Sequence, residues 1–88
     1  MSMKERITRK LNEAFTPETL EVIDESEQHR GHGGWREGGE THFRVRMTAH
    51  VFVDQSRVNR QRAVNTCLAE ELATTVHALA MELRAPND

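Results

Sequence analysis

The sequence has little of several residue types that mark particular classes of protein. It contains one cysteine, Cys67, and no tyrosine among its 88 residues. A single thiol forms neither an internal disulfide nor a structural zinc site, and such cysteine usage is typical of a reducing compartment. No apolar run is long enough to cross a bilayer, and the charged first ten residues contain no hydrophobic segment. We therefore expect a cytoplasmic protein with no membrane association.

Patterns that mark common enzyme sites are also missing. The sequence has no P-loop, no nucleophile elbow and no HExxH motif, and no pair of carboxylates is marked out by its spacing. Cys67 falls beside Leu68 at a core-facing helical position, where a thiol is usually inert packing. We predict that the protein is not an enzyme and has no small-molecule substrate.

The length and charge limit the architecture and the partners. Eighty-eight residues, of which 36% are hydrophobic and 30% charged, suit a single thin domain over residues 1–88. The formal net charge is −2, so no overall positive field attracts nucleic acid or an anionic membrane. A basic patch, where there is one, is local.

Hydrophobic periodicity divides the chain into five elements. An amphipathic helix ends near Thr16-Pro17, because proline lacks a donor and disfavours the helical conformation of the residue before it. Alternating apolar residues predict strands over residues 19–24, 42–53 and 76–83. The long second strand has an apolar face and a cationic face that carries Arg44 and Arg46. A helix capped by Ser56 should run to about Ala73.

All five glycines lie between the first two predicted strands, in a stretch that has neither helical nor strand periodicity. We predict a flexible loop over about residues 26–40, and loops of this length in a small domain are usually functional or disordered. Trp35, between two glycine pairs, suits either an anchor on the core or a contact for a partner.

The order helix, strand, strand, helix, strand predicts an α+β domain. The economical packing is a mixed three-stranded sheet with the helices on one face.

Five short motifs in this order resemble the BolA family. They are Asp24-Glu25-Ser26, Glu40-Thr41-His42-Phe43-Arg44-Val45, Asn59-Arg60-Gln61-Arg62, Leu68-Ala69-Glu70-Glu71-Leu72 and Val76-His77-Ala78-Leu79. The match covers most of the chain. The sequence departs from the family pattern at Gln61, where a histidine is usual, and at Asp54, where a glycine is usual.

The resemblance implies an αββαβ fold similar to class II KH domains and a function as an iron–sulfur adaptor or regulator. BolA proteins form a heterodimer with a monothiol glutaredoxin and share a two-iron two-sulfur cluster with it and with glutathione. Carried over, the family's cluster ligands are His77 and a histidine of the loop, either His29 or His32. Taken without the resemblance, these histidines are more simply a strand residue and two solvated loop residues.

The family is also credited with binding DNA and regulating transcription. Arg57, Arg60 and Arg62 give the second predicted helix a local positive patch that suits phosphate or an acidic partner, although a solvated charged face is the commoner cause of such a pattern. A KH domain clamps nucleotides with a GXXG loop between its helices, and residues 55–62 contain no glycine. The missing loop weakens this interpretation, so a nucleic-acid-binding regulator is the alternative function and not the first.

Overall fold

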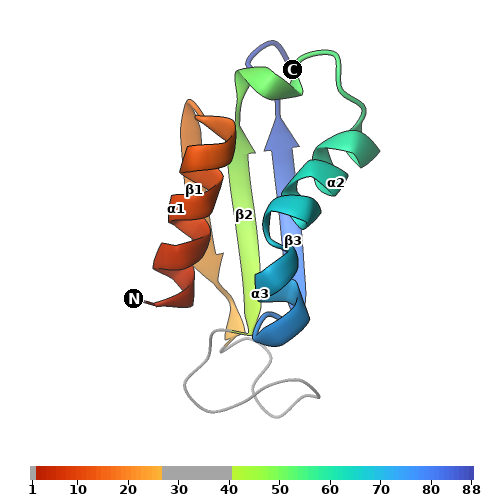
Figure 1. The fold of residues 1–88 in the computed structure, drawn as a ribbon. Helices are drawn as coiled ribbons and strands as arrows, with labels where there is room; N and C mark the ends of the chain where they lie inside the picture. The colour runs from red at the N-terminus through yellow and green to blue at the C-terminus, as the bar shows by residue number, and fades with distance from the viewer. Residues whose placement is uncertain (1, 27–40) are drawn as a thin grey trace.

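The computed structural model describes residues 2–26 and 41–88 and confirms the α+β architecture. Within these residues, three strands form one sheet, and three α-helices and a short 3-10 helix accompany it (Figure 1). The elements in chain order are α1 (Met3–Phe15), β1 (Thr19–Asp24), β2 (His42–Thr48), η2 (His50–Phe52), α2 (Arg57–Cys67), α3 (Ala69–Thr74) and β3 (Ala78–Arg84). No helix of the described residues is long and apolar enough to span a membrane.

The sheet is mixed, as the sequence predicts. Its order is β1-β2-β3, with β1 antiparallel to β2 and β3 parallel to β2. The parallel pair needs a long crossover, which η2, α2 and α3 provide. All three α-helices lie over the same face of the sheet in Figure 1.

The first helix is defined at both ends by local chemistry. The Ser2 hydroxyl accepts a hydrogen bond from the Glu5 amide at 3.1 Å, which satisfies one of the free donors of the first turn. Thr16 ends the helix with φ at 45°, and its amide donates to the Asn12 carbonyl. Pro17 then prevents the helix from continuing.

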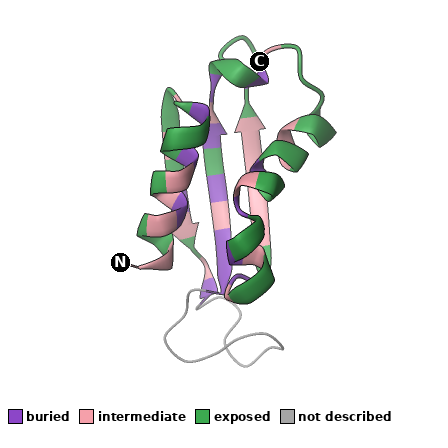
Figure 2. Ribbon diagram, viewed as in Figure 1, coloured by how far each residue is buried: buried purple, intermediate pink, exposed green. Residues whose placement is uncertain are grey.

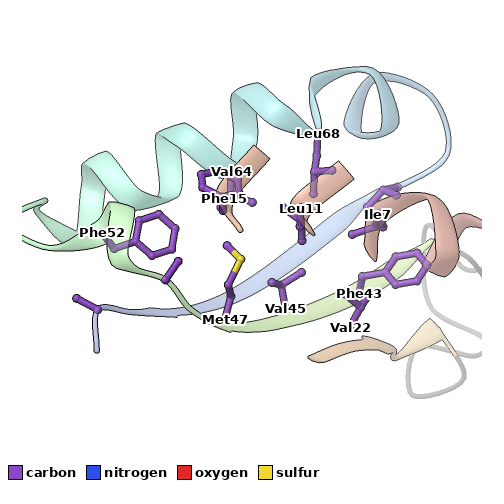
Figure 3. Close-up of a cluster of buried hydrophobic side chains, with 13 residues drawn as sticks. Ile7, Leu11, Phe15, Val22, Phe43, Val45, Met47, Phe52, Val64 and Leu68 are labelled. Atoms are coloured by element: carbon purple, nitrogen blue, oxygen red, sulfur yellow. The ribbon is translucent and has the colours of Figure 1, made fainter. Parts of the chain in front are cut away.

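The core lies between α1, β2 and the segment formed by α2 and α3 (Figure 3). Helix α1 contributes Ile7, Leu11 and Phe15 at steps of four residues, and all three are buried. In Figure 2 the buried residues concentrate on β2, the central strand, because it has a neighbour on each side. The remaining members of the buried cluster are Val22, Phe43, Val45, Met47, Ala49, Phe52, Val64, Leu68, Val76 and Ala85.

The prediction that one strand runs from His42 to Val53 was wrong in its second half. The strand ends at Thr48, and residues 50–52 form the 3-10 helix η2. This turn changes the direction of the side chains, so Phe52 is buried whereas Val51 is 53% exposed. The sequence remains apolar past the strand end, but on the turn the residue that joins the core is Phe52, which is out of phase with the alternation.

The prediction of a single helix from Ser56 to about Ala73 was partly wrong. Ser56 caps the helix as expected, since its hydroxyl accepts from the Asn59 amide at 3.1 Å. The helix breaks at Leu68, however, and a second helix, α3, follows. Val58 does not join the core and is 53% exposed. The last strand begins two residues later than predicted, at Ala78, although Val76 is buried.

The outer face of β2 is not cationic, because neighbouring carboxylates balance its charges. Arg44 pairs with Glu25 at 2.9 Å and with Glu82 at 3.5 Å. Arg46 pairs with the same Glu82 at 2.8 Å and with Glu21 at 3.3 Å. The hydrogen bond from Arg46 and the two positive charges hold the pKa of Glu82 below its ordinary value. Pairing across the strands therefore turns the predicted basic stripe into a charge-balanced ladder.

A buried carboxylate joins the first helix to α3. The side chain of Glu71 is 0% exposed, and its oxygens lie 2.8 Å from Lys10 Nζ and 2.6 Å from Arg6 Nε. The Lys10 contact is a hydrogen bond, and the Arg6 contact is an ion pair. Burial by itself raises the pKa of Glu71, but the hydrogen bond from Lys10 and the charges of Lys10 and Arg6 outweigh it and lower the pKa overall.

We expect Glu71→Gln to lower the free energy of unfolding by about 1–3 kcal/mol, because a buried hydrogen-bonded charge is replaced by a neutral group with fewer bonds. The neighbouring change Glu70→Gln is the control. Its carboxylate is exposed and pairs with Arg6 at 2.8 Å, so the loss should be about 0–1 kcal/mol. Urea denaturation at pH 7 measures both, and equal losses would contradict the role of Glu71.

The same carboxylate predicts a pH dependence. Because the pKa of Glu71 is lowered on folding, its contribution is fully present above the ordinary value of 4.5 and is lost as the pH falls through the lower folded value. The free energy of unfolding, measured by denaturation at several values between pH 7 and pH 3, should therefore fall less steeply towards acid pH for Glu71→Gln than for the wild type. An equal fall in the two proteins would show that the ionisation of Glu71 does not stabilise the fold.

Candidate functional site

His77 lies where α3 ends and the last strand is about to begin. Its amide donates to the Thr41 carbonyl at 2.7 Å, and the Ala78 amide donates to the same oxygen at 3.2 Å. The residue itself is exposed. Its backbone is therefore fixed to the sheet while its imidazole faces solvent, an arrangement that allows a partner to reach it.

The start of β2 is tied to the end of β1 by one buried hydroxyl. The Ser26 Oγ accepts from the Thr41 amide at 3.0 Å and from the His42 amide at 3.1 Å. The Ser26 amide donates in turn to the Asp24 carboxylate at 2.9 Å. Because Ser26 and Thr41 are fully buried, these bonds face little competition from water.

His42 occupies a different environment from the one the strand pattern predicts. Alternation places it with Arg44 and Arg46 on the polar face, yet it is only 8% exposed. Its Nδ1 lies 2.8 Å from the Thr41 hydroxyl oxygen. Its ring is stacked near that of His77, with centroids 6.4 Å apart and planes at 30°. The structure thus brings together two histidines that are 35 positions apart in the sequence.

Two of the predicted cluster ligands, His29 and His32, lie outside the described residues, as does Trp35. The residues that flank this segment, Ser26 and Thr41, are both part of the hydrogen-bonded group beside His77. Within residues 2–26 and 41–88, no group of three or more His, Cys, Asp or Glu side chains is arranged to hold a metal ion.

The three arginines of the alternative site differ in their surroundings. Arg57 and Arg62 are exposed on α2 and make no ion pair with the described residues. Arg60 has a side chain that is only 12% exposed, and it pairs with the Asp88 carboxylate at 2.5 Å. It also donates to the backbone carbonyls of Gln55 and Leu83 and lies over the Phe52 ring. Arg60 therefore has a structural role.

The ion pair with Arg60 also lowers the pKa of its partner, Asp88. The hydrogen bond from Arg60 and a second from the Ala85 amide lower the pKa of Asp88 to about 2. A cleft of about 470 Å³ lies beside this pair, between α2 and β3, and Arg57 and Arg84 also line it. It is at the end of β3 that is remote from His77, so the two candidate sites are separate.

Cys67 behaves as the sequence predicts. It is half-buried, and its thiol lies 3.7 Å from the Lys10 carbonyl oxygen. Burial raises the pKa of the Cys67 thiol, which disfavours the reactive thiolate. This environment is that of a packing residue.

Comparison with known proteins identifies the family. The family model described as BolA-like protein matches residues 11–88. The chain belongs to the BolA family. It is 52% identical over 89 residues to an uncharacterized protein in the cobS 5' region of Sinorhizobium sp., covering all of this chain and 96% of that protein. It is 46% identical over 81 residues to the DNA-binding transcriptional regulator BolA of Escherichia coli, covering 92% and 73%.

Solved structures of BolA proteins have the same fold. The BolA domain of SufE1 from Arabidopsis thaliana superposes with a TM-score of 0.88 at 37% identity, covering 99% of this chain and 95% of that one. BolA1 from the same plant gives a TM-score of 0.89 at 32% identity, covering 100% and 96%. The αββαβ fold expected from the resemblance is thereby confirmed.

One departure from the BolA pattern has a structural explanation. Asp54 has a φ of 64°, the left-handed conformation in which glycine carries no steric cost. Aspartate is among the few other residues that enter this region readily. The turn that leads into α2 is therefore kept at this position without glycine.

The sequence predicted His77 as a candidate ligand but did not indicate the hydrogen-bonded group around it. Ser26, Thr41 and His42 belong to motifs that the sequence shares with BolA proteins, and this was the one signal that marked them. Their contacts join residues 15 or 16 positions apart, and such contacts leave no periodicity in the sequence.

We expect Ser26→Ala to lower the free energy of unfolding by about 2–6 kcal/mol, because it leaves two amide donors without a partner and each costs about 1–3 kcal/mol when buried. Hydrogen exchange of the Thr41 and His42 amides should quicken more than that of the β2 amides beyond them. Ser56→Ala, which removes an exposed helix cap, is the control and should cost about 0.5–2 kcal/mol without affecting those two amides. Unchanged exchange in Ser26→Ala would contradict the role of this hydroxyl.

Proposed function

We propose that this protein is an adaptor that binds a monothiol glutaredoxin and helps to hold a two-iron two-sulfur cluster between the two proteins. BolA proteins are regulators or adaptors, and the relatives of this chain include a DNA-binding transcriptional regulator and a SufE-like protein. The observation that carries the proposal is the position of His77. Its exposed imidazole stands on a backbone anchored to Thr41, next to both ends of the segment that contains His29 and His32.

The donor set suits an iron–sulfur cluster. Imidazole nitrogen is a good ligand for iron, and histidine replaces cysteine on one iron in some two-iron two-sulfur centres. His77 would be one ligand, and His29 or His32 the second. The glutaredoxin cysteine and glutathione would provide the others.

The anchoring of His77 favours binding by this chain. The hydrogen bond from its amide to Thr41 fixes the backbone of His77, so less conformational entropy is lost when the imidazole binds iron. A second ligand from the adjoining segment would complete the pair contributed by this protein. The remaining ligands would come from the glutaredoxin and glutathione.

The test mixes this protein with a cluster-loaded monothiol glutaredoxin and glutathione and records visible circular dichroism. We expect the wild type to convert the glutaredoxin spectrum into that of a new heterodimer. His77→Ala should abolish the conversion, and whichever of His29→Ala and His32→Ala also does so identifies the second ligand.

His50→Ala is the matched control, because His50 is an exposed histidine on η2, beyond the opposite end of β2. It should behave as the wild type. A glutaredoxin spectrum left untouched by the wild-type protein would refute the cluster function. A His77→Ala variant that is folded and still converts the spectrum would refute His77 as a ligand.

A second function, DNA binding, is favoured by the exposure of Arg57 and Arg62 on one helix and by the E. coli relative that is named a DNA-binding regulator. Arg60 is unsuitable for the test, since its loss would also remove the bonds to Asp88 and the backbone. The informative variant is the double change Arg57→Ala, Arg62→Ala.

If DNA binding is the function, the double variant should weaken retardation of duplex DNA. The dependence of binding on salt concentration should also fall, by about one unit of slope for each phosphate that the variant no longer neutralises. Arg9→Ala, an exposed arginine on α1, is the control. Retardation unaffected by the double change would exclude α2 as the DNA-binding element.

A further inference from the structure

His42 is the buried histidine whose ring lies beside that of His77. We propose that His42 is a positioning residue: it holds the His77 imidazole in place and does not itself offer a nitrogen to the cluster. The inference rests on the proposed function in so far as His77 is the ligand. Its basis is the hydrogen-bond arrangement of Ser26, Thr41 and His42, which decides the state of the His42 ring.

The first step concerns the proton of the Thr41 hydroxyl. The oxygen of Ser26 has two lone pairs, and the amides of Thr41 and His42 donate to it at 3.0 and 3.1 Å. The two hydroxyl oxygens are 3.4 Å apart, whereas the Thr41 oxygen and His42 Nδ1 are 2.8 Å apart. Because both lone pairs of Ser26 are taken by amides and the contact to Nδ1 is the shorter one, we assign the Thr41 proton to that contact, with Thr41 donating to Nδ1.

The second step follows from the tautomers of imidazole. In a neutral ring one nitrogen carries a proton and the other accepts, so an accepting Nδ1 places the proton on Nε2. Neither nitrogen then has a lone pair available to a metal, since that of Nδ1 is engaged by Thr41 and Nε2 is protonated. His42 is also only 8% exposed, which limits access from a partner. These two facts make His42 unsuitable as a ligand.

The third step concerns what the ring does to His77. The two centroids are 6.4 Å apart and the planes differ by 30°, within the range of aromatic pairs in proteins. Thr41 holds the side chain of His42 and Ser26 holds its backbone, so the His42 ring is fixed in one position beside the ring of His77. The Thr41 carbonyl holds the backbone of His77 at the same time. One residue, Thr41, thus positions both histidines.

The experiment determines by NMR, in the full chain at pH 8, which imidazole nitrogens carry a proton and whether the two rings are in contact. In the wild type we expect the His42 proton on Nε2 and a nuclear Overhauser effect between the two rings. Thr41→Val keeps the shape of the side chain and removes the hydroxyl. It should abolish the tautomer preference and weaken the ring contact, and Thr41→Ser should restore both.

Thr48→Val is the matched control for Thr41→Val, because Thr48 is the last residue of β2 whereas Thr41 immediately precedes its first, so Thr48 is remote from both histidines. In the glutaredoxin assay, Thr41→Val should weaken formation of the heterodimer spectrum about three- to tenfold, the range expected when a side chain must be ordered on binding. His42→Phe retains a ring without ligand nitrogens and should still form the heterodimer, whereas His42→Ala should resemble Thr41→Val.

The outcomes separate this inference from the proposed function. A His42 ring that carries its proton on Nδ1 in the wild type overturns the positioning arrangement. So does a folded His42→Phe variant that loses the heterodimer as fully as His77→Ala, since His42 is then a ligand. If the tautomer and ring contact are as expected but the wild type forms no heterodimer, the cluster function fails while the positioning of His77 by His42 stands.

Discussion

The hydrogen bonds around Thr41 are the constraint on which the candidate site depends. The Thr41 carbonyl accepts from the amides of His77 and Ala78, so it sets the point at which β3 joins the sheet. Its amide is bound to the buried Ser26 hydroxyl, which ties the same point to the end of β1. The hydrogen bonds of Thr41 therefore connect the ends of all three strands, and they also set the position of the exposed His77. The order of the sheet and the position of His77 have a common origin.

Several charged side chains of this protein form ion pairs within the fold and are not free for a partner. Glu71 is buried between α1 and α3, Arg44 and Arg46 are matched by carboxylates on the neighbouring strands, and Arg60 holds the turn that contains Asp88. Exposed arginines such as Arg57 and Arg62 remain available to a partner. The surface that looks basic in the sequence is thus much less so in the folded protein, which agrees with a formal net charge of −2.

The errors of the sequence-based predictions share one physical cause. Periodicity reports which side chains are apolar, but η2 and the break at Leu68 redirect the chain without interrupting the run of apolar residues. Phe52 and Val76 are buried although they lie outside the strands to which the pattern assigned them. The burial of Glu71 also has no local signal in the sequence, because it depends on Lys10 and Arg6, about 60 positions away.

The sequence by itself determined the main helices and strands and their order, from which the mixed sheet was predicted, because caps, proline and alternation act over a few residues and are readable there. It did not show η2 or the break at Leu68. Its motifs also marked His77, and their resemblance to BolA proteins agrees with the family and the fold found by comparison. Only the tertiary structure decided that His42 is buried beside His77, that Thr41 holds both, and that Arg60 is committed to Asp88. These facts arise largely from contacts between residues far apart in the chain, whose energies depend on distance and burial in space rather than on spacing along the sequence.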